Sequence, residues 1–160
     1  MQGFYNVTKT IEQQLTKDVN VNTCTYGDIM DVDMDKQTIY PLSHLSVTNA
    51  TLNGHTWTFD FNLLCMDIVD EPKNYDMETE TEHFRTNTNE QDIWNTQLAV
   101  ANRLFELLRR GDLYSELYQL SGSPSMQPFT DRFENKLAGW ACTFSVEIPN
   151  DMTICAVPED

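Results

Sequence analysis

The chain has 160 residues, and its 25 acidic and 10 basic side chains give it a formal net charge of −15. Hydrophobic residues make up 40% of it and aromatic residues 11%, which argues against a disordered chain and predicts one domain, residues 1–160, with its own core. The shortage of Lys and Arg disfavours binding to nucleic-acid phosphates and to anionic membrane surfaces, because both require positive charge.

No segment of the sequence predicts insertion into a membrane or transport across one. The N-terminus lacks the basic and apolar regions of a secretory signal, and no apolar run is long enough to span a bilayer. We therefore expect a protein that is made in a cytoplasm.

The first third of the chain predicts a helix, a strand and an acidic connector. Apolar residues recur at spacings of three and four over residues 4–18, which indicates an amphipathic helix. A strand is expected over residues 21–26. The segment from Gly27 to Asp35 follows, and its alternating acids predict a solvated connector.

A β-hairpin comes next, formed by residues 44–52 and 56–68. Both segments alternate apolar and polar side chains, and they meet at Asn53-Gly54, a pair that favours the tight turn of a hairpin. Residues 69–90 then contain few apolar residues and many acids, which predicts a long loop. A loop of this length in a small domain is often functional, so we expect an arm that reaches a partner.

The clearest helix is predicted over residues 90–110. Acids occupy its first turn, two arginines its last, and Gly111 the position where a left-handed residue commonly ends a helix. Residues 112–120 are expected to add a short helical or extended piece. The apolar stripe of the helix consists of Ile93, Trp94, Leu98, Ala101, Leu104, Phe105 and Leu108.

The last part of the chain predicts a turn at Ser121–Pro124 and then a strand. The strand has an apolar side formed by Trp140, Cys142, Phe144, Val146 and Ile148. The order of elements predicts an α+β fold: a mostly antiparallel sheet with a β-hairpin, flanked on one face by an N-terminal helix and a long central helix.

Motifs of catalysis and metal binding are not evident. Asp31, Asp33 and Asp35 alternate as at the start of a calcium loop, but Lys36 and Leu42 stand where that loop needs Gly and Glu. The histidines lack metal-ligand spacing, and no nucleophile elbow, phosphate loop or dinucleotide fingerprint occurs. We therefore expect no metal, no cofactor and no catalytic residue, while a site assembled only in the fold stays open.

Four widely spaced cysteines without a C-x-x-C pair predict free thiols rather than a zinc site. The four are Cys24, Cys65, Cys142 and Cys155. Cys65 and Cys142 lie within the strand patterns, so we expect them to be buried as small apolar residues.

The succession of segments resembles the tail-terminator (tail-completion) proteins of long-tailed bacteriophages over residues 3–155. An aromatic-Asp-aromatic strand, then Met-Asp, an acidic gap and a helix form the rhythm of that family. The resembling segments are FYNVTKTIEQQL, DVNVNTCTYGDI, IYPLSHLSVTNATLNGHTWTFDFNLLCMDIVD, NEQDIWNTQLAVANRLFELL and PFTDRFENKLAGWACTFSVEIP.

The resemblance implies a structural virion protein rather than an enzyme. Members form a homo-oligomeric ring, commonly a hexamer, that caps the head-proximal end of the tail tube, ends tube polymerisation and docks to the neck or head connector. The implied partners are other copies of the chain, the tail tube protein and the neck or connector protein. The implied location is the virion tail or neck, after assembly in the host cytoplasm.

DNA would pass through the lumen of such a ring without specific binding, and an acidic surface would suit that passage. On this hypothesis the acids of the connector face the lumen and those of the long loop meet a partner. The candidate interface residues are therefore Asp31, Asp33, Asp35, Asp76, Glu78, Glu80 and Glu82.

Three alternatives stay open. A neck or head–tail connector protein would also be a ring of small acidic subunits. The charge alone would suit an acidic inhibitor of a host protein or a DNA mimic, and a small enzyme could assemble its site only in the fold. Ring assembly favours the terminator and the connector, whereas a monomer with a convergent polar pocket favours the enzyme.

Overall fold

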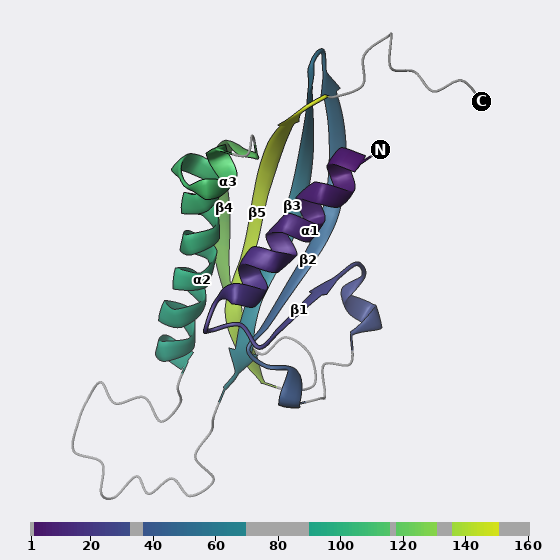
Figure 1. Ribbon diagram of the computed structural model, residues 1–160. Helices are drawn as coiled ribbons and strands as arrows, with labels where there is room; N and C mark the ends of the chain where they lie inside the picture. The colour runs from purple at the N-terminus through teal and green to yellow at the C-terminus, as the bar shows by residue number, and fades with distance from the viewer. Residues whose placement is uncertain (1, 33–36, 70–89, 116–117, 131–135, 151–160) are drawn as a thin grey trace, which may run out of the picture.

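The computed structural model describes residues 2–32, 37–69, 90–115, 118–130 and 136–150 (Figure 1). They form an α+β fold with one five-stranded sheet in the order β1-β2-β3-β5-β4, in which only the β1–β2 pair is parallel. The helices are α1 (Gln2–Lys17), α2 (Glu90–Arg110) and α3 (Asp112–Ser115), with short 3-10 helices η1 (Ile29–Asp31) and η2 (Gln37–Ile39); the strands are β1 (Thr23–Tyr26), β2 (Leu42–Asn53), β3 (Thr56–Ile68), β4 (Gln119–Thr130) and β5 (Leu137–Pro149).

The predicted hairpin is confirmed as β2 and β3, two strands of 12 and 13 residues. Gly54 supplies the positive φ of 60° that the tight turn requires. The pairing stays antiparallel along the whole length, with one irregularity between Val47 and Asn49. The resulting hairpin is the longest feature of the sheet, and its tip stands beyond both long helices in Figure 1.

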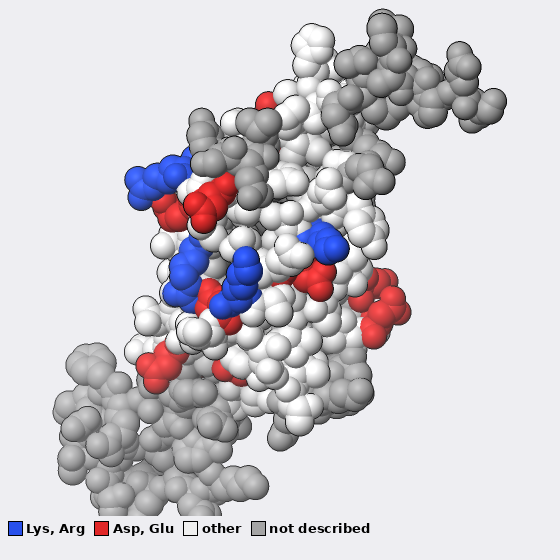
Figure 2. Space-filling view, in the orientation of Figure 1, with Lys and Arg blue, Asp and Glu red and all other residues white. Residues whose placement is uncertain are grey.

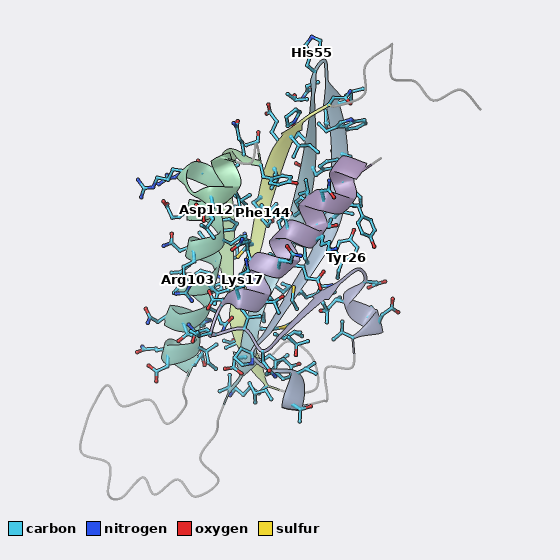
Figure 3. The ribbon with its side chains drawn as sticks, viewed as in Figure 1. Lys17, Tyr26, His55, Arg103, Asp112 and Phe144 are labelled. Carbon is cyan, nitrogen blue, oxygen red and sulfur yellow. The ribbon has the colours of Figure 1, made fainter. Side chains whose placement is uncertain are left out.

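The main core lies between one face of the sheet and the two long helices. Helix α1 buries Val7, Ile11 and Leu15, as its spacing predicts. Aromatic rings join α2 to the sheet, since Phe105 of α2 packs edge-on against Phe144 of β5 at 5.1 Å between ring centroids. Figure 3 labels Phe144 between α1 and α2. The prediction that both helices flank one face is confirmed.

The buried stripe of α2 differs in part from the prediction. Trp94 and Leu98 are only half-buried, whereas Gln97 and Val100 are buried. The carbonyl of Trp94 accepts a hydrogen bond from the indole N–H of Trp140 at 2.8 Å, which ties the helix to β5. The helix is therefore rotated slightly from the face that apolar spacing alone selects.

A second, smaller core lies on the other face of the sheet, at the end where β2 begins. Its buried members are Tyr40, Leu42, Met66, Phe129 and Leu137. Half-buried apolar residues pack against them, namely Ile29 and Val32 of the connector and Ile39 of η2. The connector is therefore not only a solvated turn, because its apolar residues cover this end of the sheet.

The turn predicted at Ser121–Pro124 is wrong, because these residues belong to β4. The pairing of β4 with β5 shifts register between Ser121 and Ser125, and Gly122 has a φ of 73°. The residues that favour a turn thus form a bulge in a strand at the edge of the sheet. Edge strands tolerate Pro and Gly because their outer backbone groups need no partner.

Helix α2 ends at Arg110 and Gly111 follows it, as predicted, but Gly111 is not among the glycines with a positive φ. Its N–H donates to the carbonyl of Leu107 at 3.2 Å, so the helical pattern continues through it. An added Cβ would lie 2.8 Å from the Leu107 Cα. The missing side chain therefore serves a close contact rather than a left-handed turn.

An ion pair joins the end of α1 to the middle of α2. The guanidinium of Arg103 donates from Nε and Nη2 to the two carboxylate oxygens of Asp18, at 2.6 and 2.7 Å (Figure 3). The Asp18 side chain is only 8% exposed. Desolvation raises its pKa, but hydrogen bonds from Arg103 and from the N–H of Asn20 hold the pKa below the usual value.

We expect Arg103→Ala to lower the free energy of unfolding by about 1–3 kcal/mol at pH 7, because it leaves the Asp18 carboxylate without its partner. The stabilisation exists above the unfolded pKa of about 4 and disappears as the pH falls through the lower folded pKa. Urea denaturation at pH 7 and below pH 4 measures the difference.

The matched control is Arg109→Ala, which removes an exposed pair with Glu106 on the same helix. Its expected effect is below about 0.5 kcal/mol at either pH. Equal losses for the two variants would contradict the role given to the Asp18–Arg103 pair.

Candidate functional site

The sheet face opposite α1 and α2 is polar beyond the second core. Side chains at paired positions of neighbouring strands project from the same face, so the register places the polar sides of β2, β3, β4 and β5 together. No helix in the described part of the chain covers them. We call this surface the open face, formed by Asn49, Thr51, Thr58, Asp60, Asn62, Ser121, Ser125, Gln127, Thr143, Ser145 and Glu147.

Hydrogen bonds between strands organise the centre of the open face. Asp60 accepts from the hydroxyl of Ser145 at 2.5 Å and from the amide of Asn49 at 3.4 Å. Beside it, the Thr143 hydroxyl donates to the Asn62 carbonyl oxygen at 3.2 Å. The Asp60 carboxylate is therefore held in place by three strands, and it presents a fixed negative charge.

The charge of the open face has one sign only. None of the five strands contains Lys or Arg, and their acids are Asp60, Asp67 and Glu147. The helix face differs: Figure 2 shows basic and acidic side chains mixed over α1 and α2. The basic residues of those two helices are Lys9, Lys17, Arg103, Arg109 and Arg110.

Of the predicted interface acids, Asp31 is the one that the described residues include. Asp31 is exposed and is the last residue of η1. Asp28 caps the start of η1, because its carboxylate accepts a hydrogen bond from the N–H of Met30 at 2.9 Å. Asp28 and Ile29 line a cleft of about 430 Å³ together with open-face residues, so η1 lies beside the open face. The predicted acids outside the described residues are Asp33, Asp35, Asp76, Glu78, Glu80 and Glu82.

His44 fixes the connector to the sheet, a role that its sequence context does not reveal. Its Nε2 donates to the carbonyl of Gly27 at 2.9 Å, because that oxygen only accepts, and Nδ1 then accepts from the Thr25 hydroxyl at 2.7 Å. Burial lowers the pKa of His44, although the bond to Gly27 and the charge of Asp28 act in the opposite direction. The neutral ring therefore holds β1 and the start of η1 against β2.

We expect the stability of the protein to fall as the pH drops below about 6.5, the usual His pKa. The folded pKa of His44 is lowered, so the unfolded chain takes up the proton first and becomes favoured. Urea denaturation at pH 7.5 and 5.5 measures the change. His44→Gln, which does not titrate, should lose less stability over this interval.

The matched control is His55→Gln, at the exposed tip of the hairpin (Figure 3). This variant should keep the wild-type pH dependence. Identical behaviour of the two variants would show that His44 is not the group responsible.

The described cysteines are poorly suited to nucleophilic chemistry. Cys24, Cys65 and Cys142 are free thiols, and Cys65 and Cys142 are buried, as predicted. Burial raises the pKa of Cys24 to about 12, and the bond to Cys142 together with burial raises the pKa of Cys65 well above its usual value. These two thiols therefore stay protonated near neutral pH, where a nucleophilic cysteine must ionise.

Other chemistry finds little support in the described residues. They contain no group of three His, Cys, Asp or Glu side chains placed to hold a metal ion. In the cleft beside η1 both ring nitrogens of His44 are already hydrogen-bonded, so that residue is not free to act on a substrate. No helix among the described residues is long and apolar enough to cross a membrane.

The described residues define a class: an α+β protein whose one sheet has one face covered by helices, while the other face is polar beyond the second core and has no Lys or Arg in its strands. No protein-family model and no curated protein matches the chain.

Proposed function

We propose that this protein is a structural subunit of a phage virion that caps the head-proximal end of the tail tube. Copies of the chain form a ring, a hexamer on the pattern of the family it resembles, which ends tube polymerisation and docks to the neck or head connector. The α+β fold agrees with the expectation from the resemblance. The open face is the observation that carries the proposal.

The open face has the properties that the wall of a DNA channel needs. Proteins hold DNA mainly by placing Lys and Arg on its phosphates, which releases bound counterions. The strands provide no such groups, and the fixed carboxylate of Asp60 repels phosphate. In the proposed ring this face and the connector with Asp31 point to the lumen, where DNA slides without adhering.

Most of the negative charge lies outside the described residues. The described part contains 11 of the 25 acidic residues and six of the 10 basic residues. It therefore carries a charge of −5 out of the net −15. Segment 70–89 alone carries −4 and joins β3 to α2. We propose that its acids, Asp76, Glu78, Glu80 and Glu82, meet the tube or the neck protein.

A neck or head–tail connector ring is the second candidate, because the open face suits its channel equally well. A DNA mimic is less well supported, since two acids of the helix face are paired with arginines. Arg103 binds Asp18, and Arg109 and Arg110 both bind Glu106. Paired acids do not present the free negative charge by which a mimic would bind a basic partner.

The first test is the state of assembly. We expect the purified protein to form closed rings with a central hole, alone or with tail tube protein, as measured by light scattering and negative-stain imaging. Addition to growing tubes should stop their elongation, and binding to the tube rather than to the neck alone favours the terminator. A protein that stays monomeric at high concentration and neither caps nor joins tubes contradicts the proposal.

A double variant, Asn62→Lys with Thr143→Lys, tests whether the open face lines the lumen, because it adds positive charge to that face. Both positions are exposed. Rings of this double variant should bind duplex DNA, whereas wild-type rings should not. Each new phosphate contact should steepen the fall of log K with log salt by about 1. Titration of labelled DNA at two or more salt concentrations measures the effect.

The matched control adds the same charge to the helix face with Gln91→Lys and Asn95→Lys, two exposed positions of α2. These rings should bind DNA no better than the wild type. Equal DNA binding by the two double variants would show that the open face does not line the channel.

A further inference from the structure

Two thirds of strand β2 has an edge that no described strand covers. β1 pairs with Leu42–Leu45 and leaves the sheet at Gly27, whose N–H donates to the carbonyl of Leu45 at 3.0 Å. The eight residues Ser46–Asn53 continue the strand with β3 on one side only. We call them the β2 edge. No described strand occupies the position beside them, in line with β1.

The β2 edge lacks the features that protect sheet edges from other chains. It contains no charged residue and no Pro, and it exposes 37% of Val47 and 51% of Leu52. At the opposite edge of the sheet, β4 carries Pro124, Pro128 and a bulge, which hinder pairing. One edge of the sheet is thus closed to further strands and the other is suited to accept one.

A cleft continues the β2 edge under helix α1. It has a volume of about 300 Å³, and its lining includes Phe4, Tyr5, Tyr26 and Leu45. Tyr5 and Tyr26 expose 69% and 48% of their surface, and Tyr26 ends β1, where Figure 3 labels it. A strand added beside β2 would bury its apolar side chains against these rings.

The sequence after β5 has the composition of such a strand. The chain leaves the sheet at the tip of the hairpin, where the N–H of Asn150 donates to the carbonyl of His55 at 2.7 Å. Residues 152–157 read Met-Thr-Ile-Cys-Ala-Val, uncharged and rich in apolar and β-branched side chains, between Asp151 and Pro158. Six extended residues span about 20 Å, which fits within the roughly 26 Å of the β2 edge.

We propose that residues 152–157 of one copy of the chain pair as a strand with the β2 edge of a second copy. This inference deepens the proposed ring and rests on it. Because the two surfaces differ, each subunit would give one strand and accept one, which is a head-to-tail contact of the kind that closes rings. Main-chain hydrogen bonds would supply the affinity, as in other strand additions.

The reach of the chain favours a second copy over the same one. From β5 to the position outside β2 is three strand spacings, about 14 Å, because β3 and β2 lie between. An extended chain needs at least about four residues to cover that distance. Pairing within the same copy could then begin only near residue 155, so Met152, Thr153 and Ile154 of the apolar run would lie in the crossing instead of beside β2.

The experiment uses three full-length variants. Val47→Lys with Leu52→Lys disables the β2 edge, and Ile154→Pro disables the donated strand. Val19→Lys is the matched control, since Val19 is an apolar residue with 94% exposure outside the edge. Unfolding midpoints are checked first, because only variants that fold like the wild type are compared. Light scattering then measures the assembled fraction.

We expect the edge variant and the Ile154→Pro variant each to raise the dissociation constant for self-assembly at least about tenfold, a change of 1.4 kcal/mol, while Val19→Lys assembles normally. Mixing the two defective variants should give 1:1 heterodimers, because Ile154→Pro retains an intact edge and the edge variant retains an intact strand. Assembly of Ile154→Pro alone would overturn the proposal and point to pairing between two β2 edges.

The two proposals fail in different ways. Normal rings from both defective variants would overturn the strand exchange and leave the ring intact. Heterodimers from the mixture, combined with wild-type assemblies that do not close into rings, would support the strand exchange and refute the ring.

Discussion

The pairing of β3 with β5 is the constraint on which the rest of the structure depends. All 13 residues of each strand take part, in antiparallel register without a shift. This register aligns Phe61 with Phe144 on the helix face and Asp60 with Ser145 on the open face. A slip of one residue would exchange the two faces and turn the aromatic rings away from the helices. The core and the open face are thus two results of one pairing.

Periodicity was sufficient to predict those parts of the fold that repeat a pattern over many residues. The hairpin, α2 and the two faces of β5 are such cases, since each contains several turns or alternations. The sequence could not show that Ser121–Pro124 continues a strand, because turn-forming residues are also those of a bulged edge, and only the pairing with β5 distinguishes them. The rotation of α2 that buries Gln97 likewise depends on packing against the sheet.

The candidate site was predicted less well than the fold. Acidic segments were visible in the sequence, and η1, which Asp31 ends, begins beside the open face. The open face itself draws on residues from four strands, none of which has a motif, so it exists only once the register is known. The sequence feature that could have indicated the open face is the lack of Lys and Arg in the segments that form the strands. His44 gave no signal at all, because its partners lie in β1 and the turn after it.

Charge explains why assembly through a strand edge suits this protein. Copies with a net charge of −15 repel one another, and salt screens that repulsion only beyond about 8 Å at physiological ionic strength. A contact made of ionised side chains would therefore have to separate or neutralise acids on both partners. The β2 edge avoids this cost, since Ser46–Asn53 contains no charge and main-chain hydrogen bonds need none. In the proposed ring, the neutral edge joins the subunits, and the acidic groups remain on the surfaces that face DNA and other virion proteins.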